Sequence, residues 1–66
     1  MGKFENRMAE ALYTWSLDGF ADEERTRDGE WMGRIGNKIL REDTLGFVNV
    51  IHFDTIEAAK VAFATL

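Results

Sequence analysis

The stretch Phe47-Val48-Asn49-Val50-Ile51-His52-Phe53-Asp54 decides the predicted fold. Its β-branched and aromatic residues predict a strand over residues 47–53. Asp54, with Glu57 three positions later, predicts the N-cap and capping box of a helix over residues 55–66. Successive side chains of a strand point to opposite faces, so Val48 and Val50 point to one face and the other apolar residues of the stretch to the opposite face. Both faces of this strand are therefore expected to need burial.

Two further strands are predicted just before this stretch. Trp31, Gly33 and Ile35 alternate with Met32 and Arg34, which is typical of a strand over residues 30–35 with one apolar face. The dipeptide at positions 36–37, Gly-Asn, indicates a two-residue turn of type II′, after which residues 38–42 return as a second strand. Together with residues 47–53 they predict a three-stranded antiparallel meander.

The N-terminal third predicts a helix over residues 3–18. Its apolar residues recur every three or four positions, as on one stripe of a helix: Phe4, Met8, Ala11, Leu12 and Trp15. Gly19 can take a positive φ after the last turn, so Phe20 is expected to fold back onto Trp15 in a Schellman-type cap. Residues 19–29 are polar and end in Asp-Gly, which indicates a solvated connector.

These elements predict a single α+β domain over residues 1–66, a two-layer α-β-β-β-α arrangement with both helices on one face of the meander. The expected core comprises Phe4, Met8, Leu12, Trp15, Trp31, Ile35, Phe47, Ile51, Phe53, Ile56 and Phe63. The second face would then expose an apolar patch of Met32, Leu40, Val48 and Val50. We expect a homodimer through these four residues. The alternative is that the connector, residues 21–29, folds across that face.

Composition excludes several classes of function. With 8 basic and 12 acidic residues the formal net charge is −4, which disfavours a general binder of nucleic-acid backbones. The chain has no Cys and a single His, His52, which has no neighbouring nucleophile motif and cannot build a zinc site alone. No apolar run reaches membrane-spanning length and no signal peptide is visible. We expect a cytoplasmic, non-enzymatic protein with no catalytic residues, metal or cofactor.

The segment Gly33-Arg34-Ile35-Gly36-Asn37-Lys38-Ile39 looks like the G-x-x-G loop with which KH domains clamp a nucleic-acid backbone. That resemblance implies an alternative function, nucleic-acid binding through Arg34, Lys38 and Arg41. A Gly-Asn hairpin turn explains the same residues with fewer assumptions. A third interpretation is that the acidic connector imitates a nucleic-acid backbone, although Arg25 and Arg27 dilute its charge.

The run from Gly46 to Phe63, GFVNVIHFDTIEAAKVAF, resembles the closing strand and helix of small, mostly uncharacterised bacteriophage proteins, particularly those of actinobacteriophages. Such a resemblance implies a protein that acts by binding a host or phage protein. The absence of a catalytic set and the two apolar faces of the strand over residues 47–53 favour a non-enzymatic protein-interaction protein that acts as a homodimer. This is the leading hypothesis, with a partner surface formed by Tyr13, Arg34, Lys38 and Arg41. Tyr13 is included because it lies off the apolar stripe of the first helix and is expected to be exposed.

Overall fold

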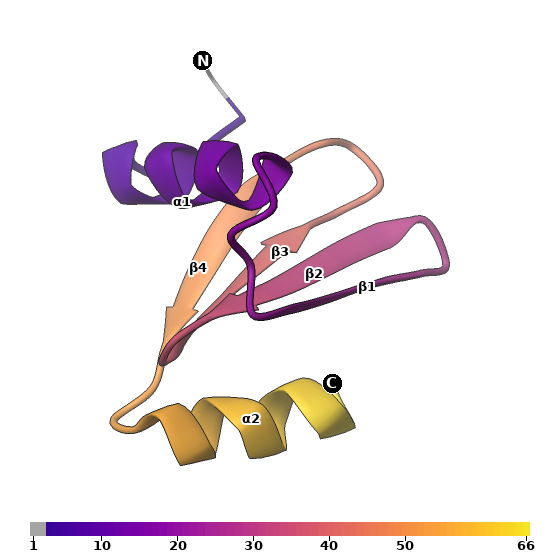
Figure 1. Ribbon diagram of the computed structural model, residues 1–66. Coiled ribbons are helices and arrows are strands. Elements are labelled where there is room, and N and C mark those ends of the chain that lie inside the picture. The colour runs from indigo at the N-terminus through magenta and orange to yellow at the C-terminus, as the bar shows by residue number, and fades with distance from the viewer. Residues whose placement is uncertain (1–2) are drawn as a thin grey trace.

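The computed structural model describes residues 3–66 and has the order α-β-β-β-β-α (Figure 1). The elements are α1 (Arg7–Leu17), β1 (Glu23–Arg27), β2 (Glu30–Ile35), β3 (Lys38–Glu42), β4 (Val48–His52) and α2 (Ile56–Thr65). The four strands form one antiparallel sheet in sequence order. The α+β class expected from the sequence is confirmed, whereas the three-stranded meander is wrong, because the sheet has a fourth strand.

The additional strand, β1, lies within the segment expected to be a solvated connector. It pairs with β2 from Glu23 opposite Arg34 to Arg27 opposite Glu30. The connection is a two-residue hairpin in which Asp28 and Gly29 both have positive φ, 55° and 80°. This is the requirement of a type I′ turn, which matches the twist of the flanking strands and favours Asp-Gly. Strand pairing therefore explains this polar segment better than a free connector.

The two helices lie on opposite faces of the sheet, so the expected two-layer arrangement is also wrong (Figure 1). On the α1 face, Ala9 packs with Leu40 and Val48. On the α2 face, Phe63 packs with Met32 and Ile39. Both faces of the central strands carry apolar side chains, and one amphipathic helix covers each of them.

The buried hydrophobic residues differ from the expected core. They are Ala9, Met32, Ile39, Leu40, Val48, Ala59 and Phe63. Of the expected core, only Phe63 is among them. Four of the other predicted residues are exposed: Met8, Trp15, Phe47 and Ile56. The remaining six are partly buried around the two clusters or beside them: Phe4, Leu12, Trp31, Ile35, Ile51 and Phe53.

Helix α1 begins later than expected because residues 3–5 pair with β4 instead. The Val48 amide donates to the Lys3 carbonyl at 2.7 Å, and the Glu5 amide donates to the Val48 carbonyl at 3.0 Å. The Glu5 side chain also accepts from the Val50 amide at 2.9 Å. These contacts satisfy main-chain groups on the edge of the sheet. The helix then starts after Asn6, whose side chain caps the Ala9 amide at 2.9 Å.

The other helix ends also show how local residues set the boundaries. The Phe20 amide bonds to the Trp15 carbonyl at 3.2 Å across Gly19, whose φ is +93°, so the predicted Schellman cap of α1 is confirmed. At α2 the N-cap is Thr55, which accepts from the Ala58 amide at 3.0 Å, and not the expected Asp54. Neither helix within residues 3–66 is long and apolar enough to cross a membrane.

Candidate functional site

The four residues of the predicted dimer patch do not share an exposed face. Leu40 is paired with Val50 on the α1 face, where Val48 is also buried. Met32 is paired with Arg41, and Arg41 is paired in turn with Asn49, so the three side chains point to the same face of the sheet. On that face Met32 is buried against Phe63 of α2. The two helices thus cover these side chains within one chain. Leu40, Val48 and Met32 are therefore not exposed for the predicted homodimer interface.

Tyr13 is not a free contact residue but part of an aromatic cluster between α1 and the sheet. Its ring lies 5.6 Å from Trp31 in an edge-to-face arrangement and 5.7 Å from Phe4. Its hydroxyl donates to Glu42 Oε1 at 2.9 Å. Burial, then the hydrogen bond and the negative charge of Glu42, raise the pKa of the Tyr13 phenol above its ordinary value. These contacts anchor α1 to β2 and β3.

Arg34 is buried and neutralised by acidic residues at the start of β1. Only 6% of the residue is exposed. Its Nε donates to Glu23 at 2.5 Å, and its Nη1 donates to the Gly36 carbonyl at 2.8 Å and lies 3.4 Å from Asp22. Asp22 also accepts from the Gly36 amide at 2.8 Å. This network ties β1 to the β2–β3 turn, so Arg34 is structural and is not available to a phosphate backbone.

The three basic residues of the predicted nucleic-acid patch are not brought together. Arg34 and Arg41 face α2, whereas Lys38 belongs to the α1 face, because it lies opposite Ile35. Lys38 donates to Asn37 at 3.1 Å, and Arg41 lies 3.8 Å from Glu30. The glycines do not form a G-x-x-G loop either. Gly33 lies inside β2 under the Trp31 ring, and Gly36, with φ +59°, occupies the tight β2–β3 turn.

His52 and the acidic residues form no metal-binding cluster in the part of the chain that the structure describes. His52 is exposed at the end of β4. No three His, Asp or Glu residues among positions 3–66 are placed to hold a metal ion.

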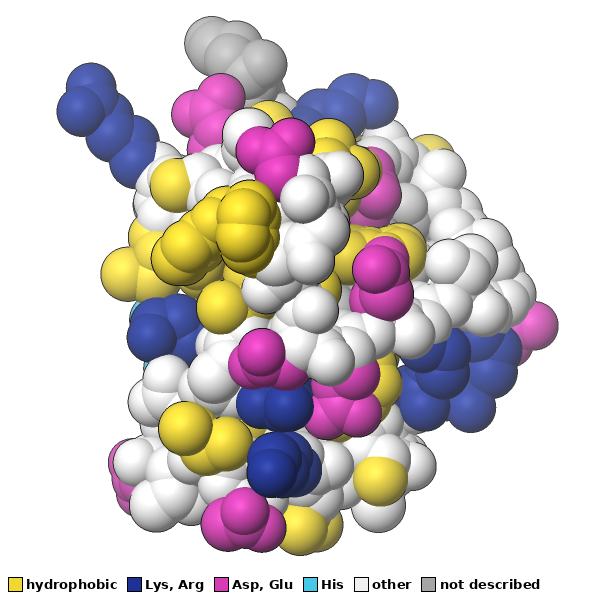
Figure 2. Space-filling view, in the orientation of Figure 1, with side chains coloured by type: hydrophobic (Ala, Val, Ile, Leu, Met, Phe, Trp, Pro, Cys, Tyr) yellow, Lys and Arg dark blue, Asp and Glu magenta, His cyan; other side chains and the backbone are white. Residues whose placement is uncertain are grey.

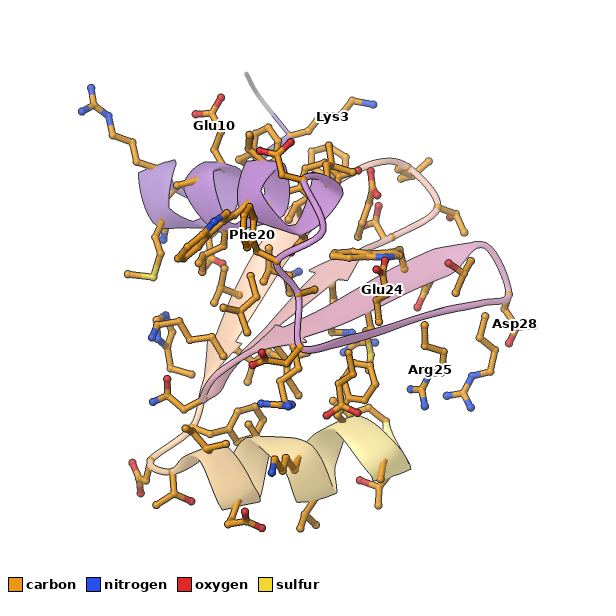
Figure 3. The ribbon with its side chains drawn as sticks, viewed as in Figure 1. Lys3, Glu10, Phe20, Glu24, Arg25 and Asp28 are labelled. Atoms are coloured by element: carbon orange, nitrogen blue, oxygen red, sulfur yellow. The ribbon has the colours of Figure 1, made fainter. Side chains whose placement is uncertain are left out.

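An apolar stripe on α1 is exposed, and it continues to Phe20 just beyond the end of the helix. It consists of Met8, Ala11, Trp15 and Phe20, and we call it the α1 surface. The first three are spaced i, i+3 and i+7, so they lie on one side of the helix. Half of Trp15 and 59% of Phe20 remain exposed. Figure 2 shows hydrophobic side chains gathered on this side of α1, and Figure 3 places Phe20 directly beneath the helix.

The aromatic pair in the α1 surface is held in place by the helix cap. The rings of Trp15 and Phe20 lie 5.7 Å apart at 44°. The Schellman hydrogen bond fixes the backbone of Phe20 relative to Trp15, so the two rings form a preset ridge. Periodicity alone assigned Met8 and Trp15 to the core. Periodicity does not tell how many apolar residues of the stripe the sheet can cover. In the structure Ala9 and Leu12 already fill the contact with the sheet, so Met8 and Trp15 stay exposed.

Comparison with known proteins gives no match: no family model, no curated protein and no solved structure is similar to this chain.

Proposed function

We propose that this is a non-enzymatic protein-interaction protein whose contact surface is the α1 surface. The single observation that supports the proposal is the Trp15–Phe20 ridge, two large aromatic side chains half exposed beside each other on a 66-residue chain. Aromatic residues are enriched at the centres of protein interfaces, where they bury large areas. The partner we propose is a host or phage protein, the setting implied by the resemblance of residues 46–63.

The rigidity of the ridge favours binding. Each aromatic side chain has only two rotatable bonds, and the backbone of Phe20 is already held by the cap. Little conformational entropy is therefore lost when a partner covers the ridge. The two rings contact each other, but about half of each residue stays exposed, so a partner that covers them would bury further apolar area.

A homodimer remains a second proposal, and it must now use a different surface. Since Leu40, Val48 and Met32 are buried, we propose the α1 surface as the place where a second copy of the chain would bind. Nucleic-acid binding through Arg34, Lys38 and Arg41 gains no support from the geometry, because Arg34 is neutralised by Asp22 and Glu23.

The test is affinity capture with the double variant Trp15→Ser/Phe20→Ser beside the wild type. The matched control is Val61→Ser, which removes an exposed apolar side chain from α2, on the other side of the molecule. We expect the wild type and the control to retain the same partner from host extract and the double variant to lose it. Circular dichroism checks that all three are folded. Equal capture by all three proteins would refute the proposal.

Light scattering of the same three proteins tests the second copy as the occupant. A dimeric mass for the wild type and the Val61→Ser control, with a monomeric mass for the double variant, would assign the α1 surface to self-association. A monomeric mass for all three would exclude the homodimer at that surface.

A further inference from the structure

A small basic pocket lies on the opposite side of the molecule from the α1 surface, between the sheet and the end of α2. Its lining is formed by Arg25, Arg27, Glu30, Met32, Arg41 and Leu66. Figure 3 shows Arg25 pointing from β1 towards the end of α2, while its neighbour Glu24 points to the other face of the sheet. Figure 2 shows basic side chains gathered at this corner.

Strand register brings the three arginines together. Arg25 lies opposite Met32, and Met32 lies opposite Arg41, so these residues form one row across β1, β2 and β3. Arg27 is two residues beyond Arg25 on the same strand and therefore points to the same face. Nothing in the local sequence indicates this cluster, because Arg25 and Arg41 are sixteen positions apart.

Two of the guanidinium groups already converge on a single oxygen atom. Arg25 Nη2 and Arg27 Nη2 both donate to the main-chain oxygen of Leu66, the latter at 2.5 Å. Arg25 is also held from the side, since its guanidinium lies 5.2 Å from the centre of the Phe63 ring and its Nη2 lies 3.9 Å from the Met32 sulfur. The donors are thus preorganised around an oxygen ligand.

Positive charge is in excess at this pocket. Among the described residues, the one ion pair here joins Arg41 to Glu30 at 3.8 Å, and no carboxylate side chain lies within 4 Å of Arg25 or Arg27. Even a full negative charge on the Leu66 oxygen would leave three arginines facing two negative charges. This excess stands out in a chain whose net charge is −4.

Capping of α2 explains part of the arrangement. The last turn of α2 contains no basic residue, so Arg25 and Arg27 supply positive charge and donors where the helix has unpaired carbonyls. Capping does not use Arg41, and among residues 3–66 the Leu66 oxygen is the only oxygen that accepts from the guanidinium group of Arg25 or Arg27.

We propose that the pocket formed by Arg25, Arg27 and Arg41 binds a phosphate group. A phosphate dianion offers several oxygen acceptors to converging guanidinium forks and neutralises the excess charge. The closeness of Glu30 and the net negative charge of the chain disfavour a long polyanion, so the ligand is a single phosphate, either inorganic phosphate or a phosphate monoester. In the structure the main-chain oxygen of Leu66 accepts from Arg25 and Arg27, so the phosphate displaces this oxygen when it binds.

The experiment titrates inorganic phosphate into the full chain at constant ionic strength, following amide chemical shifts by NMR. We expect saturable shifts in β1, β3 and the end of α2. Arg27→Gln and Arg41→Gln should each weaken binding about tenfold, the effect of losing one charge-assisted hydrogen bond. Both side chains are at least partly exposed, so neither change should unfold the protein. Glu30→Gln should tighten binding, because it removes the competing carboxylate.

Arg7→Gln is the matched control, since Arg7 is exposed at the start of α1 on the other face of the sheet. The control should bind phosphate like the wild type. A second titration with O-phosphoserine separates the sources: tighter binding than inorganic phosphate identifies a monoester, and weaker binding identifies the free ion. Shifts that do not saturate, or that Arg7→Gln reduces as much as Arg27→Gln does, would overturn the proposal and leave the arginines as a helix cap.

Discussion

The indole of Trp31 lies against the backbone of Gly33, two residues further along β2. A Cβ atom added to Gly33 would stand 2.5 Å from Cη2 and 2.7 Å from Cζ2 of that ring. The Trp31 ring therefore packs directly on the backbone of Gly33. Tyr13 of α1 contacts the same ring in an edge-to-face arrangement. A residue that resembled a phosphate-binding glycine in the sequence proves to be a packing residue.

Gly33→Ala is expected to destabilise the protein by about 1–3 kcal/mol, the usual cost of overpacking a well-filled site. The melting temperature should fall accordingly, which thermal unfolding followed by circular dichroism measures. In a Trp31→Leu background the same change should cost clearly less, because the ring that it strikes is gone. An equal cost in both backgrounds would show that the contact with Trp31 is not the cause.

Tyr13→Phe removes the hydrogen bond to Glu42 and leaves the aromatic packing in place. We expect a loss of about 0.5–1.5 kcal/mol in the free energy of unfolding at neutral pH, measured by urea denaturation. Because Glu42 is partly buried, Glu42→Gln is the companion variant, and it should cost less than Tyr13→Phe, since an amide oxygen can still accept from the phenol. A cost near zero for Tyr13→Phe would contradict the role given to the hydroxyl.

The free energy of unfolding should fall at alkaline pH partly because of Tyr13. Its pKa is raised in the folded state by burial and then by Glu42, so the folded protein holds the phenolic proton more tightly than the unfolded chain does. This stabilisation is complete below the ordinary pKa of about 10 and is lost as pH rises through the folded-state value. Between neutral and strongly alkaline pH, the wild type should therefore lose more stability than Tyr13→Phe. Parallel losses in the two proteins would contradict the prediction.

Arg34 and Arg41 should behave very differently when mutated, although both face α2. Arg34→Ala removes a buried side chain and its bonds to Glu23 and Gly36, and should cost about 2–4 kcal/mol, a range set by lost packing and lost charge-assisted hydrogen bonds. Arg34→Met should cost less, because it keeps the apolar volume. Arg41→Met should change stability by about 0.5 kcal/mol or less, as expected for an exposed ion pair. Urea denaturation of the three variants checks this order.

Ser16 and Asn6 give a contrasting pair on α1. Ser16 is 4% exposed and its hydroxyl has no hydrogen-bond partner among the described residues. Ser16→Ala should therefore leave stability unchanged or raise it by up to about 1 kcal/mol, since alanine is the better helix former and carries no polar group to bury. Asn6→Ala removes the N-cap and should cost about 0.5–2 kcal/mol. Thermal unfolding decides both, and a destabilised Ser16→Ala would reveal a hydroxyl contact.

Features that depend on neighbouring residues were predictable. The fold-back of Phe20 onto Trp15 follows from Gly19, and the β2–β3 hairpin follows from the Gly36-Asn37 dipeptide. The Asp28-Gly29 dipeptide carries the same kind of signal for β1, but the polar composition of residues 21–29 concealed it. The α1 surface was not predictable in this way. A helical stripe of apolar residues does not tell how many of its side chains the sheet can cover.

The sequence by itself determined the α+β class, the turn between β2 and β3, the cap of α1 and the alternation of side chains along each strand. These features depend on backbone preferences within a few residues. Only the tertiary structure decided that Arg34 is buried between Asp22 and Glu23, and that Arg25, Arg27 and Arg41 share one pocket. It also decided that each helix covers its own face of the sheet. The physical reason is that register and layer order come from contacts between residues far apart in the chain, whose free energies no local pattern contains.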